Sequence, residues 1–108
     1  MAFTTNTQTN ADGVLKRAQG VIVSDGGAAA ALTITLGFAP THINFQNVTD
    51  RIGDEWFTGM TSGNSIHTVA AGTRTLETTN GITVSGNTFS LTATTMAASK
   101  TFVWQAEG

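Results

Sequence analysis

The chain contains no cysteine and no tyrosine, a single proline, and few charged residues. Without cysteine there is no disulfide, thiolate metal site, iron–sulfur cluster or cysteine nucleophile. Charged residues make up 11% of the chain, whereas an average soluble domain has about 25%. Threonine (21 residues) and glycine (12 residues) are abundant instead. The sequence therefore predicts a polar but weakly charged surface.

Positive charge is also scarce and is not clustered. The five Lys and Arg residues are scattered along the chain and the formal net charge is −2, which disfavours nucleic-acid binding because no basic stripe could neutralise a run of phosphates. The first residues lack a basic segment followed by an apolar one, and the most apolar window, residues 28–39, is short and interrupted by Thr33 and Thr35. We therefore expect neither signal-directed export nor a membrane span. The length of 108 residues fits one domain.

Short β-type runs separated by turn residues dominate the rest of the sequence. The runs cover residues 21–23, 32–36, 42–48, 55–60, 65–69, 82–84, 89–93 and 101–106. Residues 70–79 fit either an irregular segment or one short helical turn. Several short strands at regular spacing, with no amphipathic helix, predict an all-β fold. We expect an antiparallel β-sandwich or jelly-roll-like barrel of about seven or eight strands.

Alternation within these runs predicts which side chains face the core. Phe102, Trp104 and Ala106 share one side of the last strand, because side chains two residues apart in a strand point the same way. Trp56 and Phe57 are neighbours, so they must face opposite sides of their sheet. One of the two aromatic rings is therefore expected near the surface, where it could anchor an interface.

Residues 1–19 contain few large apolar side chains, namely Phe3, Val14 and Leu15, and show no period that would bury a face. We predict an extended N-terminal arm at residues 1–19, followed by a single β-sandwich domain at residues 20–108. The arm is expected to lie across neighbouring subunits. The candidate interface residues are Phe3, Val14, Leu15, Trp56, Phe57 and Met60.

Candidate catalytic and metal-binding groups are few. His42 and His67 lack nearby partners at ligand spacing, and thiolates are absent, so two ordinary strand histidines are favoured over a zinc site. Ser65 and His67 lie two residues apart on one strand face, but no G-x-S-x-G turn presents the serine for a hydrolase.

The cluster Asp50, Asp54 and Glu55 could in principle bind calcium or act as an acid–base pair. Its spacing does not match an EF-hand, and Arg51 lies within it, so a solvated turn is favoured. The sequence therefore predicts no catalytic residue, no metal and no cofactor.

One pattern resembles a known family. Residues 37–51 read GFAPTHINFQNVTDR and residues 55–60 read EWFTGM. This is similar to small virion proteins of tailed bacteriophages that carry a G-F-x-P … x-N-x-T-D-R … E-W-x-x-G-M core. The segment from Asn80 to Val84 and the closing hairpin also resemble the C-terminal end of these proteins. The resemblance covers about residues 30–106. It rests on residues with a structural role and not on a catalytic signature.

The resemblance implies a capsid decoration, or cement, protein. Such a protein is non-enzymatic, binds between subunits of the major capsid protein, and stabilises the head; a homo-oligomer on the capsid surface, assembled in the host cytoplasm, is expected. No nucleic-acid or membrane partner is implied. The alternative is a tail or fibre component, or a carbohydrate-binding β-sandwich. An enzyme would need activity traceable to Ser65, His67 or the acidic turn.

Overall fold

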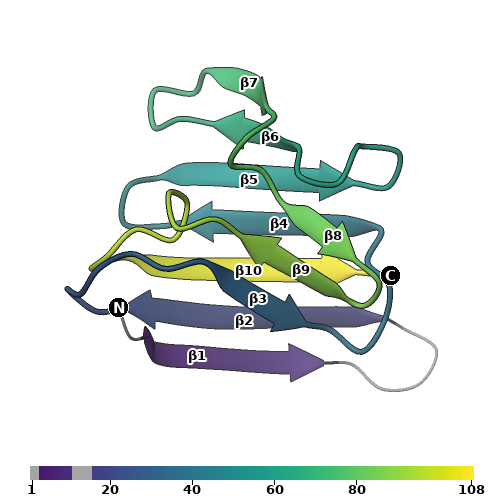
Figure 1. Ribbon diagram of the computed structural model, residues 1–108, viewed down its shortest axis with the longest axis horizontal. Helices are drawn as coiled ribbons and strands as arrows, with labels where there is room; N and C mark the ends of the chain where they lie inside the picture. Colours follow the sequence, from purple (N-terminus) through teal and green to yellow (C-terminus); the bar gives the residue numbers. More distant parts are fainter. Residues whose placement is uncertain (1–2, 11–15) are drawn as a thin grey trace.

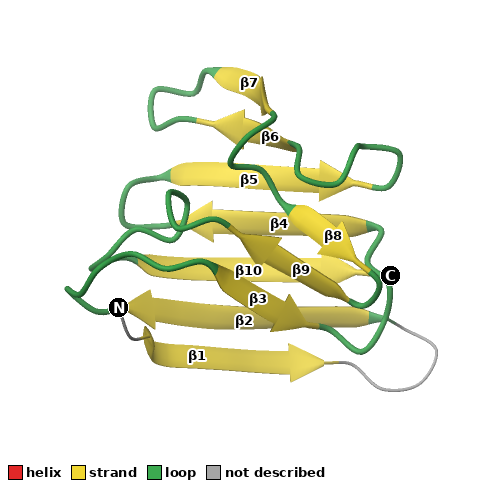
Figure 2. Cartoon of the chain, viewed as in Figure 1, coloured by secondary structure: helices red, strands yellow, loops and turns green. Residues whose placement is uncertain are grey.

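The computed structural model describes residues 3–10 and 16–108, and these residues form ten strands and no helix (Figures 1 and 2). The prediction of an all-β antiparallel sandwich is confirmed, with more strands than expected. The strands are β1 (Phe3–Asn10), β2 (Arg17–Ser24), β3 (Leu32–Thr35), β4 (His42–Asn47), β5 (Ile52–Phe57), β6 (Ser65–Thr68), β7 (Arg74–Glu77), β8 (Thr83–Ser85), β9 (Thr88–Leu91) and β10 (Thr101–Glu107). No helix in this part of the chain is long and apolar enough to cross a membrane.

The strands form two sheets of unequal size. The larger sheet has the order β1-β2-β10-β4-β5-β6-β7, and the smaller sheet has the order β3-β9-β8. The smaller sheet lies across one face of the larger one, over its middle strands (Figure 1). β10, the last strand of the chain, pairs with both β2 and β4 and therefore lies in the interior of the larger sheet.

The core fills the space between the two sheets. Phe45 of β4 packs against Phe102 of β10 with ring centroids 5.5 Å apart, and Phe89 of β9 meets Trp104 edge to face at 5.4 Å. The predicted inward side of β10 is confirmed, since its alternate residues are buried. The buried apolar residues are Ala18, Ile22, Ile34, Leu36, Ile43, Phe45, Trp56, Ile82, Phe89, Leu91, Met96, Phe102, Trp104 and Ala106.

The N-terminal region differs from the expected separate arm. β1 pairs antiparallel with β2 along its length, so residues 3–10 belong to the larger sheet. The predicted boundary at residue 20 falls inside β2, whose Ala18 is 1% exposed. A strand with few large apolar side chains can join a sheet because its backbone N–H and C=O groups form the ladder whatever its side chains are.

Residues 70–79, which the sequence left undecided, contain strand β7 and the turn that leads into it. Gly72 has a φ of 95°, a left-handed conformation that glycine adopts without steric cost. Its backbone N–H donates to the Val69 carbonyl oxygen at 2.8 Å, which closes the turn. β7 then pairs with β6 and becomes an edge of the larger sheet.

Candidate functional site

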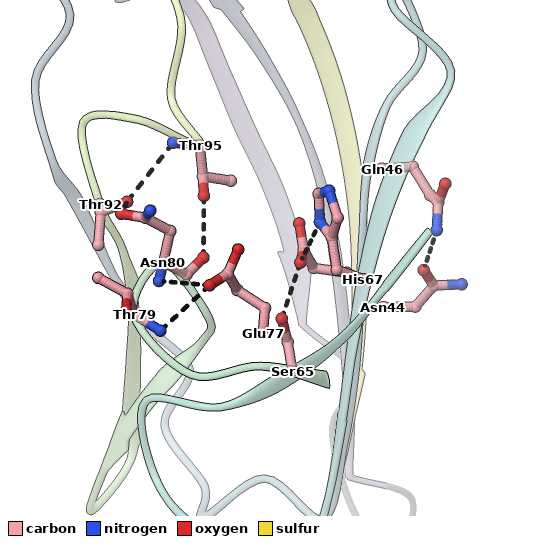
Figure 3. Close-up of polar contacts among 10 residues, drawn as sticks. Asn44, Gln46, Ser65, His67, Glu77, Thr79, Asn80, Thr92 and Thr95 are labelled. Atoms are coloured by element: carbon pink, nitrogen blue, oxygen red, sulfur yellow. Dashed lines mark hydrogen bonds and ion pairs between the residues drawn. The ribbon is translucent and has the colours of Figure 1, made fainter. Parts of the chain in front are cut away.

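Ser65, His67 and Asp54 converge on the inner face of the larger sheet. Asp54 lies directly opposite His67 in the β5–β6 pairing, and Ser65 lies two residues before His67 on the same face. The Ser65 hydroxyl donates to Asp54 Oδ1 at 2.7 Å, and His67 Nδ1 lies 2.9 Å from the same oxygen (Figure 3). Asp54 is 3% exposed and Ser65 is fully buried. One buried carboxylate oxygen therefore ties both side chains of β6 to β5.

This arrangement holds the imidazole as a catalytic aspartate–histidine pair does, but it does not activate the serine. In a hydrolytic triad the serine hydroxyl donates to the imidazole nitrogen that is not bonded to the carboxylate. Here the Ser65 hydroxyl donates to Asp54 itself. The predicted proximity of Ser65 and His67 is thus present, but their geometry is that of a structural network.

The acidic residues Asp50, Asp54 and Glu55 are close in the sequence but point to different places in the structure. Asp50 lies in the β4–β5 turn, where Lys100 Nζ contacts Asp50 Oδ1 at 3.0 Å. The hydrogen bond from Lys100 holds the pKa of Asp50 below its ordinary value. Asp54 points inward, and Glu55 faces outward, where it contacts His42 Nε2 at 3.3 Å. The described residues hold no group of three or more His, Asp or Glu side chains arranged to bind a metal.

A cavity of about 250 Å³ lies beside the Asp54 network, between the larger sheet and the loops that follow β7 and β9. Phe45 and Ile52 supply part of an apolar wall, and Asp54, His67 and Glu77 supply acidic and imidazole groups. The remaining lining residues are Asn47, Asn80, Thr94, Thr95 and Ala97. The cavity therefore combines an apolar side with a strongly polar one, as small-ligand pockets do.

At the cavity Asn80 joins two loops, while Glu77 bonds to the backbone of its own loop. Glu77 Oε2 accepts the backbone N–H groups of Thr79 at 3.1 Å and Asn80 at 3.3 Å. Asn80 Oδ1 accepts from the Thr92 hydroxyl at 2.9 Å, and the Thr95 hydroxyl donates to the Asn80 carbonyl oxygen at 3.1 Å (Figure 3). These bonds hold the rim of the cavity in place.

The two backbone donors give Glu77 a pH-dependent role in stability. The hydrogen bonds from Thr79 and Asn80 lower the pKa of Glu77 below its ordinary value of 4.5. A carboxyl whose pKa is lower in the folded state stabilises the fold above its unfolded pKa and loses that contribution as the pH falls through the folded value.

We therefore expect Glu77→Gln to destabilise the protein at neutral pH, with the difference from the parent shrinking as the pH falls below about 4.5. Urea unfolding between pH 7 and pH 3 measures this difference, and Glu107→Gln is the control because Glu107 is exposed at the end of β10. A Glu77→Gln difference that stays constant over this range would contradict the assignment.

A second surface lies on the opposite side of the larger sheet, away from β3, β9 and β8. We call this surface the open face. It consists of the side chains that alternate with the core residues, among them Val21, His42, Asn44, Gln46, Glu55, Phe57, Ile66, Arg74, Leu76 and Val103. Val21 and Val103 are each 36% exposed and Leu76 is 63% exposed. Within the described residues, no second layer of the chain packs on this face.

An aromatic pair marks one end of the open face. Phe57 is 41% exposed and stacks on His42, its partner in the β4–β5 ladder, with ring centroids 4.5 Å apart and an interplanar angle of 19°. His42 also contacts Glu55, which contacts Arg74 at 3.7 Å. The imidazole thus packs on the Phe57 ring, which keeps much of its surface exposed.

The predicted interface residues occupy different environments. Phe57 lies on the open face, as the alternation allowed. Trp56 is 6% exposed and belongs to the core, so its assignment as a surface anchor is corrected: the inward side of β5 is covered by the smaller sheet and its connections. Phe3 and Met60 are partly buried against the core. The assigned positions 14 and 15 lie outside the described residues.

Sequence reasoning missed the residues that complete the cavity, Glu77, Asn80 and Thr95. They come from segments with weak strand signals, and their proximity depends on loop packing that no local pattern encodes. The amides of Asn44 and Gln46 could have been found, because they alternate with the inward Ile43 and Phe45; in the structure Gln46 Nε2 donates to Asn44 Oδ1 at 2.6 Å (Figure 3).

Comparison with known proteins gives no assignment: no family model, no curated protein and no solved structure matches the chain.

Proposed function

We propose that this protein is a structural component of a tailed-phage virion that decorates the capsid and stabilises it by binding between major capsid protein subunits. The observation that carries the proposal is the open face: a sheet surface with exposed valines, side-chain amides and an exposed aromatic ring stacked on His42 at one end. The resemblance of residues 37–51 and 55–60 to small phage virion proteins supports the same function.

The chemistry of the open face suits a protein partner. Gln105, Asn44 and Glu55 lie in one row across three neighbouring strands. Side-chain amides both donate and accept hydrogen bonds. Exposed valines beside them supply apolar contact area, and the negative charge of Glu55 has Arg74 3.7 Å away. A surface with low net charge lets neighbouring copies approach without strong repulsion.

Binding to several capsid subunits at once can hold the protein in place even when each contact is weak. A homo-oligomer that touches several capsid subunits at once gains effective concentration without new contacts per chain. The proposal therefore places the protein on the capsid surface, after assembly in the host cytoplasm, with neither a membrane nor nucleic acid as its partner. The function requires no catalysis and no cofactor.

Phe57→Ala tests the proposal. We expect at least a tenfold lower occupancy on purified particles, because an exposed aromatic ring at an interface contributes disproportionately to affinity. Occupancy is measured by sedimenting the particles and quantifying the bound chain, and imaging of the particles locates it. The matched control is Val69→Ala, an exposed apolar residue in the β6–β7 turn. Full occupancy by Phe57→Ala, or a location away from the head, would contradict the proposal.

The aromatic pair also favours a second function, recognition of a carbohydrate by a virion-attached module. Phe57 and His42 present an apolar ring surface beside the amides of Asn44 and Gln46, and this combination can pack on a sugar ring while hydrogen-bonding its hydroxyl groups. A glycan array separates the two functions. Saturable glycan binding that Phe57→Ala abolishes, together with a tail location, would replace capsid decoration by this function.

A further inference from the structure

The cavity beside Asp54 has two carboxylates, each with one oxygen fully occupied. Asp54 Oδ1 receives both Ser65 and His67, and Glu77 Oε2 receives two backbone N–H groups. The other two oxygens, Asp54 Oδ2 and Glu77 Oε1, belong to residues that line the cavity. No donor to Asp54 Oδ2 is found among the described residues, whereas the Glu77 carboxylate also interacts with the backbone N–H of Thr78. The cavity is therefore lined by two carboxylates, and the buried Asp54 keeps one oxygen without a donor in the described part of the chain.

Further acceptors lie on the same walls. The Thr95 hydroxyl uses its proton to bond the Asn80 carbonyl oxygen, so its lone pairs remain available to accept. His67 Nδ1 lies 2.9 Å from Asp54 Oδ1 on the same wall. The polar side of the cavity thus contains two carboxylates and a hydroxyl oxygen that can accept hydrogen bonds, among neutral amide and hydroxyl side chains.

The other side of the cavity is apolar. Phe45, Ile52 and Ala97 line it, and these residues can pack against methylene groups but cannot hydrogen-bond to a ligand through their side chains. The volume of about 250 Å³ lies below the range of about 300–1,000 Å³ that is typical for drug-sized ligands. The site therefore fits one slender group with a polar head and an apolar stem.

We propose that this cavity binds a primary ammonium group, with the ammonium between Asp54 and Glu77 and its alkyl chain against Phe45 and Ile52. An ammonium group has three N–H donors and no acceptor, which complements the carboxylates of Asp54 and Glu77 and the hydroxyl oxygen of Thr95. A divalent metal ion is a poorer fit, because calcium takes six to eight oxygen ligands and the described residues include no metal-binding group of three or more side chains.

The ammonium group can come from a free alkylamine or from a lysine side chain of a partner protein. Both sources share the charged head and the methylene stem, so the binding chemistry is the same. The inference concerns the inner side of the sandwich and is independent of the open face, so either proposal can fail while the other stands.

The test is a titration of the ¹⁵N-labelled full chain, followed by NMR at constant ionic strength. Butylammonium chloride is the free-amine probe, and Nα-acetyl-lysine-N′-methylamide is the lysine probe. We expect saturable shifts confined to the cavity rim, including the amides of Thr79, Asn80 and Thr95. Tighter binding of the lysine probe would identify a protein lysine as the source, and tighter binding of butylammonium would identify a free amine.

Two controls distinguish binding of the ammonium group in the cavity from nonspecific electrostatic attraction to the protein. 1-Butanol has the same alkyl chain without the charge, and we expect its affinity to be at least tenfold lower. Glu77→Gln keeps a side-chain oxygen for the two backbone donors but removes the charge, and a tenfold weaker affinity is expected. Glu107→Gln removes one charge at an exposed position outside the cavity and should bind like the parent.

Three results would overturn the inference: equal binding of 1-butanol and butylammonium, unchanged affinity of a folded Glu77→Gln variant, or shifts spread over all acidic residues without saturation. If Glu77→Gln fails to fold, the comparison of butylammonium with 1-butanol on the parent chain decides the question, because it needs no variant.

Discussion

Trp56→Ala is expected to lower the free energy of unfolding by about 3–5 kcal/mol, the usual cost of removing a large buried aromatic side chain. Trp56 is 6% exposed and belongs to the core between the sheets. Phe57→Ala, one residue later, should cost less than about 1.5 kcal/mol, since its ring is 41% exposed and loses mainly the stacking contact with His42. Urea unfolding of both variants measures this contrast.

A third variant refines the prediction for Trp56. Its indole Nε1–H is buried without a hydrogen-bond partner in the described part of the chain, and an unpaired buried donor reduces the net benefit of the side chain. Trp56→Phe is therefore expected to lose much less stability than Trp56→Ala. Equal stabilities of Trp56→Ala and Phe57→Ala would contradict the placement of Trp56 in the core and of Phe57 at the surface.

Gly81→Ala is expected to destabilise the fold by about 1–3 kcal/mol, the range for overpacking a well-packed site. A Cβ atom at Gly81 would lie 2.5 Å from the Asn64 carbonyl carbon and 2.8 Å from its Cα. These are backbone atoms, so the contact cannot be relieved by a side-chain rotation. The close approach joins the β5–β6 loop to the segment before β8, where Gly63 N–H donates to the Ile82 carbonyl oxygen at 2.8 Å.

The matched control for Gly81 is Gly26→Ala. At Gly26 the nearest atom to an added Cβ is Ser99 Oγ at 3.6 Å, an ordinary contact, so the change should stay within about 0.5 kcal/mol. Thermal and urea unfolding compare the two variants. A Gly81→Ala protein as stable as the Gly26→Ala protein would show that the backbone at residues 63–64 can move away without cost.

We propose different tasks for the two sides of the larger sheet. Asp54, Ser65 and His67 connect β5 and β6 on the buried side, next to the cavity. On the other side, Phe57 and His42 are oriented by each other and exposed. The two surfaces lie on opposite sides of one sheet, so the proposed capsid docking and the proposed ammonium binding can be tested separately.

The sequence by itself determined the fold class and the facing of many side chains. Alternation predicted that Phe102, Trp104 and Ala106 would be buried together, and they are. It also required Trp56 and Phe57 to face opposite sides, which the structure confirms, although it could not say which ring faces the core. These features are local, because a strand repeats its side-chain direction every two residues whatever it pairs with.

Only the tertiary structure decided which strands pair and in which register. Asp54 meets Ser65 and His67 because β5 pairs with β6 in one register, and a slip of one residue would place Asp54 on the opposite face from them. The incorporation of residues 3–10 into the larger sheet and the approach of Glu77 to the cavity are non-local in the same way. Such contacts depend on the packing of distant segments, so no short pattern in the sequence encodes them.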